Sequence, residues 1–160
     1  MSSENQLDIT LRDIEERDLQ ILYEHQIDPV SVAMAAFTPR DRDAFMEHWA
    51  KILVNPDVTK KVILLGDEVV GDILRFQRGG IEEIGYWIGR EHWGNGIASR
   101  ALTLFLEIEP IRPLYAIVAE HNAASLRVLE KCGFVLIDRN YQADDLPGPD
   151  VVDYLLELPA

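Results

Sequence analysis

"WIGREHWGNGIASRAL", residues 87–102, joins a predicted strand to a predicted helix and places Gly94-Asn95-Gly96 at the junction. Two interpretations are open. In the first, the glycines only form a tight turn. In the second, they let an anion approach backbone N–H groups, because glycine has no side chain and a helix N-terminus carries about half a positive charge. The stretch is not a Walker P-loop, since no Gly-Lys-Ser/Thr follows, and it lacks the third glycine of a dinucleotide fingerprint.

The size and charge of the chain limit the classes of function. Its 160 residues, of which 48% are hydrophobic, predict a single domain spanning residues 1–160 with a real core. The formal net charge of −13 repels a phosphate backbone, so nucleic acid is not an expected partner. A cationic substrate would be attracted, whereas an anionic cofactor would need a strong local site.

The N-terminal residues are polar and acidic, and they contain no apolar signal-peptide core. No apolar run approaches the roughly 20 residues of a membrane helix, so we expect a cytoplasmic protein without a membrane partner. The single cysteine, Cys132, excludes an internal disulfide. The four histidines show no metal-ligand spacing, and we therefore expect no metal.

The hydrophobic pattern predicts strands and helices in the order β-α-α-β-β-β-α-β-α-β-β. Antiparallel strands come first, and one βαβ crossover lies in the middle. The apolar run at 114–118 predicts a strand that is buried on both faces. The stretch 28–41 is ambiguous, and its two prolines and small residues suggest a loop with a short helix. The predicted helices span 15–26, 41–53, 96–108 and 122–131, and the predicted strands span 7–12, 58–65, 68–76, 81–89, 114–118, 134–141 and 151–158.

Two blocks of sequence resemble the GNAT N-acetyltransferase superfamily. The block "EIGYWIGREHWGNGIASRAL", residues 83–102, resembles its acetyl-CoA-binding segment, Gln/Arg-x-x-Gly-x-Gly/Ala. Trp93 replaces the usual Gln or Arg, while Gly96 and Ala98 match. The block "HNAASLRVLEKCGF", residues 121–134, is similar to the Asn-x-x-Ser helix of the RimJ/RimL branch.

This resemblance implies a mixed α+β fold, the GNAT acyl-CoA N-acyltransferase fold. Its sheet is twisted and mostly antiparallel, with a central parallel pair that splays apart for the cofactor. The implied activity is direct transfer of an acetyl group from acetyl-CoA to a primary amine, in a ternary complex. The acceptor would be a protein N-terminus or a small-molecule amine, and the protein a monomer or homodimer. A Rossmann-type oxidoreductase fits neither the element order nor the motif.

A non-catalytic acyl-CoA sensor or scaffold is the alternative. Many family members carry an acidic Tyr seven residues after the motif Asn, and here that position is Leu129. Ser125 matches the Ser of the RimJ/RimL pattern and could donate a hydrogen bond to the CoA sulfur. It could equally bond back to a carbonyl of its own helix.

The resemblance also implies which residues hold the cofactor. The pyrophosphate would lie on the amides that follow the central strand, and the pantetheine arm would pair with the backbone of that strand. Asn122 would cap its helix and contact the cofactor, while Lys131 would reach a phosphate or remain a solvated cation. The expected cofactor-binding residues are Trp87, Ile88, Gly94, Asn95, Gly96, Ile97, Ala98, Ser99, Asn122, Ser125 and Lys131.

Two adjacent carboxylates, Glu82 and Glu83, are the candidates for a general base. An amine must be neutral to attack, and strand alternation sends one of the two toward the acetyl group and the other away. The register counted from the glycine turn favours Glu82, and the string "EIGYWI" favours Glu83; solvated hairpin charges are the other interpretation. We expect the acceptor pocket around residues 32–37 and the loop near Leu146.

Overall fold

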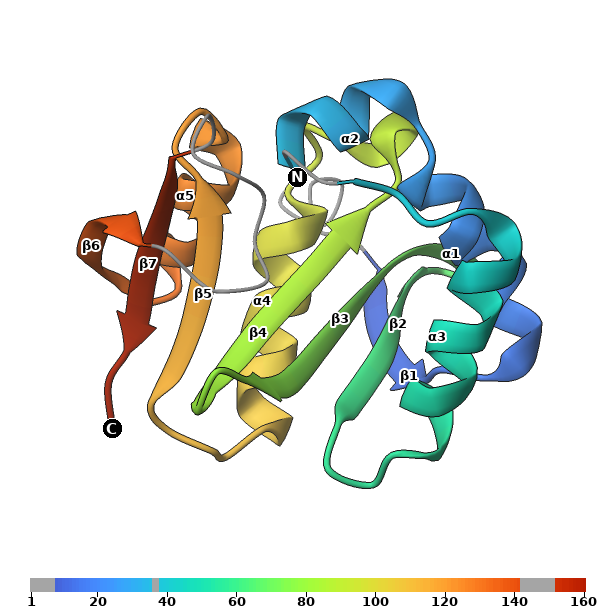
Figure 1. Cartoon of the computed structure of the whole chain (residues 1–160), viewed down its shortest axis with the longest axis horizontal. Helices are drawn as coiled ribbons and strands as arrows, with labels where there is room; N and C mark the ends of the chain where they lie inside the picture. Colours follow the sequence, from blue (N-terminus) through green and yellow to red (C-terminus); the bar gives the residue numbers. More distant parts are fainter. Residues whose placement is uncertain (1–7, 36–37, 142–151) are drawn as a thin grey trace.

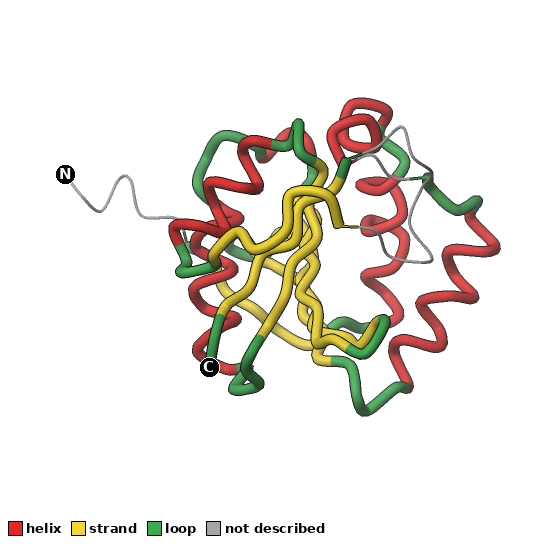
Figure 2. The backbone as a smooth tube through the Cα atoms, turned by 60° about the vertical axis from the view of Figure 1, so that its left-hand side comes forward, coloured by secondary structure: helices red, strands yellow, loops and turns green. Residues whose placement is uncertain are grey.

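The computed structural model describes residues 8–35, 38–141 and 152–160. It has a mixed α/β architecture in which helices cover both faces of one sheet (Figures 1 and 2). The elements follow one another as β1 (Ile9–Asp13), η2 (Glu16–Asp18), α1 (Leu19–Gln26), α2 (Pro29–Ala35), α3 (Arg42–Val54), β2 (Thr59–Leu65), β3 (Glu68–Arg78), β4 (Ile81–Ile88), η3 (Arg90–His92), α4 (Ile97–Ile108), β5 (Leu114–Ala119), α5 (Ala123–Lys131), β6 (Val135–Tyr141) and β7 (Asp153–Leu158).

The sheet has seven strands in the order β1-β2-β3-β4-β5-β7-β6. All neighbours are antiparallel except the central pair, β4 and β5. That parallel pair is in register at Glu83 and Tyr115, near the beginning of both strands. Beyond this point the strands diverge, as Figure 1 shows. The expected fold, with its splayed central pair, is confirmed.

The two faces of the sheet have separate cores. On the α4 face, α4 and α5 pack against Ile84, Ala116 and other apolar residues of the central strands. On the α1 face, α1 and α3 pack against β2 and β3 through Val62 and Leu74. Even-numbered residues of β4 therefore point to the α4 face, and odd-numbered residues point to the α1 face.

Strand β5 differs from its prediction. Over residues 114–118 buried and half-buried residues alternate, so the expectation of burial on both faces is wrong. Leu114 and Ala116 belong to the core of the α4 face, whereas Tyr115 and Ile117 are half-buried. The reason is that α1 and α3 pack against β2 and β3 and not against β5.

The stretch that the sequence left open contains a short helix, α2. Asp28 begins it, because its Oδ2 accepts hydrogen bonds from the Ser31 amide (2.9 Å) and hydroxyl (3.0 Å). The Nε2 atom of His121 donates to the Ala33 carbonyl at 3.1 Å, which fixes α2 above the C-terminal end of β5.

Candidate active site

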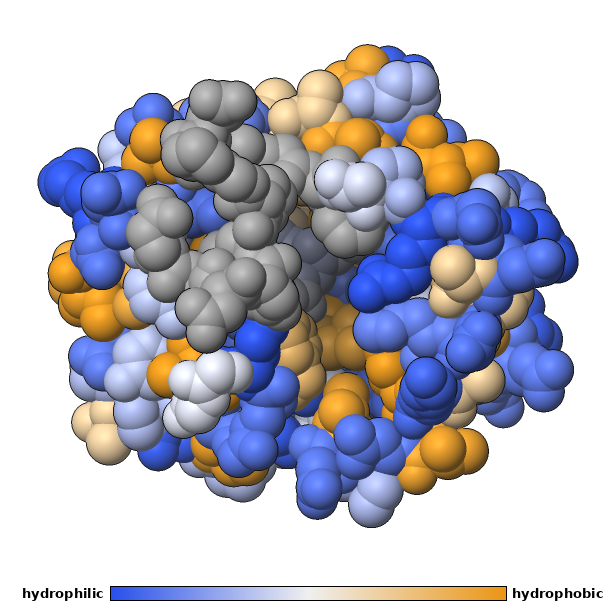
Figure 3. All heavy atoms as spheres, viewed as in Figure 1, coloured by the Kyte–Doolittle hydropathy of each residue, from blue (hydrophilic) through white to orange (hydrophobic). Residues whose placement is uncertain are grey.

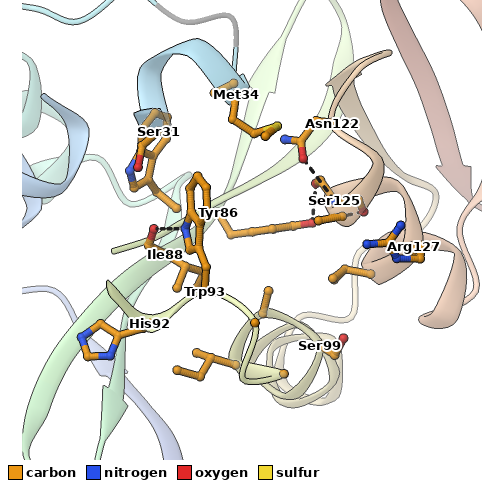
Figure 4. A pocket seen from close by; sticks show the side chains of 18 of the residues that line it. Ser31, Met34, Tyr86, Ile88, His92, Trp93, Ser99, Asn122, Ser125 and Arg127 are labelled. Carbon is orange, nitrogen blue, oxygen red and sulfur yellow. Dashed lines mark hydrogen bonds between the residues drawn. The ribbon is translucent and has the colours of Figure 1, made fainter. Parts of the chain in front are cut away.

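A cavity of about 560 Å³ lies where β4 and β5 diverge (Figure 4). Its walls come from four segments: the second half of β4, the turn that leads into α4, helix α5 with its N-cap, and α2. Its lining residues are Ser31, Met34, Ala35, Tyr86, Trp87, Ile88, His92, Trp93, Gly94, Gly96, Ile97, Ala98, Ser99, Asn122, Ala124, Ser125, Arg127, Val128 and Lys131.

The turn before α4 exposes backbone donors to this cavity. Gly94 and Gly96 have φ angles of 80° and 75°, in the left-handed region that favours glycine. A Cβ built at either position would meet no heavy atom within 4 Å, so the space beside the turn is open. The Arg100 amide donates to the Gly96 carbonyl at 3.2 Å, and the amides of residues 97–99 precede this bond at the open helix end. Such an end is suited to an anion.

Helix α5 adds cations on the opposite wall. Arg127 and Lys131 lie one turn apart on α5, and both line the cavity. Among the described residues, no carboxylate lies within ion-pairing distance of either side chain. In a chain with a net charge of −13, two uncompensated cations beside a helix N-terminus form a local positive site.

Tyr86 and Ser125 meet across the divergence of the two strands. The Tyr86 hydroxyl lies 2.6 Å from Ser125 Oγ, and the side chain of Tyr86 points from β4 toward α5 (Figure 4). Burial raises the pKa of Tyr86 to about 12. Asn122 caps α5, because its Oδ1 accepts a hydrogen bond from the Ser125 amide at 3.3 Å. Both hydroxyl groups therefore remain protonated at neutral pH and face the cavity.

Trp93 contributes through its backbone partner. Its indole Nε1 donates a hydrogen bond to the Ile88 carbonyl at 2.9 Å (Figure 4). The bond ties the α4 turn to the last residue of β4. Trp87 is held similarly on the α1 face, where its Nε1 donates to the His25 carbonyl at 3.0 Å.

The two candidate bases lie at the other end of β4 and do not line the cavity. Glu82 is on the α4 face, where its carboxylate accepts hydrogen bonds from Arg75 (2.9 Å) and Gln77 (2.7 Å). Glu83 is on the α1 face and is only 5% exposed. Arg78 donates to both of its oxygens, at 3.0 and 2.8 Å. Each carboxylate is thus engaged by an arginine of β3.

Glu82 belongs to a larger polar cluster around Arg75. The Arg75 guanidinium also donates to Glu109 at 2.9 Å, at the C-terminal end of α4. The Thr59 hydroxyl donates to the same Glu109 oxygen at 2.6 Å. Burial alone would raise the pKa of Glu109, but the hydrogen bonds from Thr59 and Arg75 outweigh it and lower that pKa. The cluster joins β2, β3, β4 and α4 far from the cavity.

The α1 face carries a second hollow feature. Figure 3 shows a depression with apolar walls over β3 and β4 on this face. Gly85 lies next to Phe76 on this face, since a Cβ at this position would meet the Phe76 ring at 3.4 Å. Glu83 and Trp87 flank Gly85 on the same face of β4.

The comparison with protein families is decisive. The model described as "Acetyltransferase (GNAT) domain" matches residues 8–135. The chain belongs to the GNAT acetyltransferase family.

Individual GNAT proteins share only a small part of their sequence with this chain. The "Uncharacterized N-acetyltransferase p20" of Bacillus licheniformis is 27% identical over 139 residues, covering 79% of this chain and 78% of that protein. Among solved structures, spermidine N-acetyltransferase from Vibrio cholerae, in complex with CoA and spermine, superposes with a TM-score of 0.77 at 21% identity, covering 94% and 95% of the two chains. RimL, a ribosomal L7/L12 α-N-protein acetyltransferase, gives a TM-score of 0.74 at 20% identity, covering 95% and 90%. At these identities the two structures support the GNAT fold alone.

The GNAT cavity gathers most of the residues that the motifs single out. Of the expected cofactor-binding residues, Asn95 is absent from the lining, because its side chain donates back to the His92 carbonyl at 3.2 Å. Sequence reasoning missed Tyr86 and Arg127, although Tyr86 stands inside the quoted string "EIGYWI" and Arg127 lies one turn before Lys131. The residues expected to bind cofactor that do line the cavity are Trp87, Ile88, Gly94, Gly96, Ile97, Ala98, Ser99, Asn122, Ser125 and Lys131.

The expected acceptor pocket is described in part. Met34 and Ala35 line the cavity, as does Ser31, just before the expected range. Residues 36–37 and the loop near Leu146 lie outside the described residues.

Two further observations concern metals and membranes. Within residues 8–35, 38–141 and 152–160, no group of three His, Cys, Asp or Glu side chains is arranged to hold a metal ion. Over the same ranges, no helix combines the length and apolar character needed to cross a bilayer.

Proposed function

We propose that this GNAT protein transfers an acetyl group from acetyl-CoA directly to a primary amine, in a ternary complex. The observation that carries the proposal is the cavity between β4 and β5. It combines an open helix N-terminus with two cations that pair with no carboxylate of the described residues, in a chain that is otherwise strongly acidic. The Vibrio cholerae relative, whose structure contains CoA, supports the same ligand class.

The residues present fit acetyl-CoA. The amides of Gly96, Ile97, Ala98 and Ser99 would bind the pyrophosphate, since the positive-φ turn leaves open space beside them. Arg127 and Lys131 would compensate phosphate charge from the opposite wall. The backbone of Trp87 and Ile88, which lines the cavity beyond the Glu83–Tyr115 pair, would bind the amide groups of the pantetheine arm. Asn122 would orient the start of α5 beside it.

Bound acetyl-CoA supplies a thioester carbonyl for attack by the amine. A C–N bond forms and the C–S bond breaks, so the electron pair passes to sulfur and the amine loses a proton. Ser125 donates a hydrogen bond to the departing thiolate. Its Oγ lines the cavity, whereas Leu129, at the position of the usual Tyr, is fully buried in the core.

The proton of the amine leaves, in this proposal, through water held at Glu83. This residue is favoured over Glu82 because it lies on the α1 face, at the position where β4 pairs with β5 before the strands diverge. Glu82 points instead into the Arg75 cluster on the opposite face.

The acceptor would approach past α2, where Ser31, Met34 and Ala35 line the cavity. The Asn-x-x-Ser helix and the RimL-like fold support membership of the RimJ/RimL branch, and thus a protein N-terminus as one acceptor class. A small amine is the other class, because a spermidine acetyltransferase superposes equally well. A single domain over residues 1–160, a cytoplasmic location and a monomeric or homodimeric state stay predictions.

The test is consumption of acetyl-CoA against peptides with free N-termini, polyamines, amino acids and aminoglycosides. We expect turnover with at least one acceptor, and initial rates that give intersecting double-reciprocal lines, as a ternary complex requires. Micromolar binding of acetyl-CoA without turnover on any acceptor would contradict the transferase proposal and favour the sensor or scaffold alternative.

A further inference from the structure

Leu129 stands on α5 at the position where many GNAT proteins carry an acidic Tyr. A tyrosine hydroxyl nevertheless lies beside Ser125, because Tyr86 supplies one from β4. Leu129 is fully buried and packs into the core of the α4 face. Tyr86 comes from β4 and places its hydroxyl 2.6 Å from Ser125 Oγ, inside the cavity. The two residues are 39 positions apart, and their hydrogen bond spans the space between the diverging strands.

We propose that Tyr86 is a positioning residue for Ser125: its phenol donates to Ser125 Oγ and directs the Ser125 hydrogen toward the CoA sulfur. This inference rests on the proposed function and names the group that makes Ser125 effective. A serine hydroxyl carries one hydrogen and accepts at two lone pairs. Once Tyr86 occupies a lone pair of Oγ, the remaining hydrogen is free to point into the cavity.

The protonation state of Tyr86 agrees with this direction of donation. Burial raises the pKa of its phenol to about 12, so it is a donor throughout the neutral range. Hydrogen bonds in a chain polarise one another, and Ser125 becomes a stronger donor when it accepts from Tyr86. The Asn122 side chain binds the Ser125 amide at 3.3 Å and leaves its hydroxyl available.

No proton needs to leave Tyr86 or Ser125 in this scheme. A thiol ionises near pH ~8.5, well below a phenol at about 12, so the thiolate is stabilised by hydrogen bonding and does not deprotonate the pair. The electron pair released by the C–S bond stays on sulfur, and the two hydroxyl groups retain their hydrogens.

The test uses the affinities of CoA and desulfo-CoA, measured by titration calorimetry between pH 6.5 and 9.5. Desulfo-CoA lacks the sulfur, so the ratio of the two affinities isolates the interaction at that atom. For the wild-type protein we expect the preference for CoA to rise about tenfold as its thiol ionises, because hydrogen bonds to charged groups are the stronger ones.

Tyr86→Phe removes one oxygen and should abolish most of this rise, as should Ser125→Ala. Because the two residues act in series, the double variant should lose no more than Ser125→Ala alone. With an acceptor from the panel, Tyr86→Phe should lower kcat about tenfold with KM for acetyl-CoA within about twofold, and Ser125→Ala should lower kcat roughly 10- to 1000-fold.

Tyr115→Phe is the matched control. Its hydroxyl donates to Glu157 at 2.8 Å outside the cavity, and the variant should keep the wild-type affinity ratio. Two results would overturn the inference: a ratio of CoA to desulfo-CoA affinity that does not change with pH in the wild-type protein, or the same ratio in Tyr86→Phe as in wild type. In either case, binding of desulfo-CoA would still support the proposed cofactor site. If the wild-type protein binds neither CoA nor desulfo-CoA, the proposed function itself is overturned.

Discussion

The two halves of β4 differ in what their side chains do. In the first half, Glu82 and Glu83 are both bound by arginines of β3. In the second half, Tyr86, Trp87 and Ile88 line the cavity. The alternation of faces is the same throughout, and what changes is the neighbouring strand, since β5 pairs with β4 at Glu83 and then diverges. The site therefore forms where strand pairing stops, and the paired end stabilises it.

The largest expected effect on stability lies in the Arg75 cluster, which holds the first half of β4. Glu109→Ala removes the buried partner of Arg75 and should lower the free energy of unfolding by roughly 3–5 kcal/mol. Urea unfolding measures this loss. The control is Glu47→Ala, which breaks an exposed pair with Lys51 (3.9 Å) and should cost less than about 1 kcal/mol. Equal losses in the two variants would contradict a stabilising role for the Arg75 cluster.

The carboxyl group of Asp72, beside the second half of β4, differs from the carboxyl groups of Glu82 and Glu83 in the first half. Asp72 lies opposite Trp87 in β3 and is 3% exposed, and within the described part of the chain its Oδ2 has no hydrogen-bond partner. Burial raises its pKa from 3.8 to about 7. The folded protein therefore binds a proton between these pH values that the unfolded chain releases. The contribution of Asp72 to the free energy of unfolding should be fully present below pH 4 and should be lost as the pH rises through 7.

The loss through Asp72 amounts to about 4 kcal/mol, as an order of magnitude, by pH 8. Asp72→Asn does not titrate, so the difference in unfolding free energy between the variant and wild type should shift toward the variant by up to that amount from pH 4 to pH 8. A difference that stays constant over this range would show that Asp72 is ionised in the folded protein.

The smallest expected effect distinguishes the two adjacent glutamates. Glu83→Gln should lower kcat about tenfold, most strongly at low pH, where neutral amine is scarcest. Glu82→Gln should leave kcat near the wild-type value, because Glu82 lies on the opposite face within the Arg75 cluster. Rates for both variants from pH 6 to 9 measure this difference. If both single variants and the double variant keep wild-type rates, the general base does not lie at this end of β4.

Local patterns predicted the parts of the fold that depend on neighbours in sequence. Gly94 and Gly96 were expected at a turn, and both adopt positive φ. Asn122 was expected to cap a helix, and it does. Strand alternation correctly predicts that Glu82 and Glu83 lie on opposite faces.

Contacts between distant segments could not be predicted in this way. The pairing of Tyr86 with Ser125 depends on the angle at which β4 and β5 diverge, and the sequence of either strand does not specify it. The arginines that bind Glu82 and Glu83 belong to β3, whose register across the hairpin decides which carboxylate each one meets. The half-buried face of β5 likewise depends on where α1 and α3 pack.

The most direct test of the account is binding of CoA to Gly96→Asp, measured by titration calorimetry. The substitution places a carboxylate in the open space beside the α4 turn, where we place the pyrophosphate. Gly80→Asp is the matched control, since Gly80 also has a positive φ (84°) and open space, but lies in the β3–β4 turn. We expect wild-type affinity for Gly80→Asp and a loss of at least about 100-fold for Gly96→Asp, equivalent to about 3 kcal/mol. Equal affinities in two folded variants would contradict a CoA site at the divergence of β4 and β5.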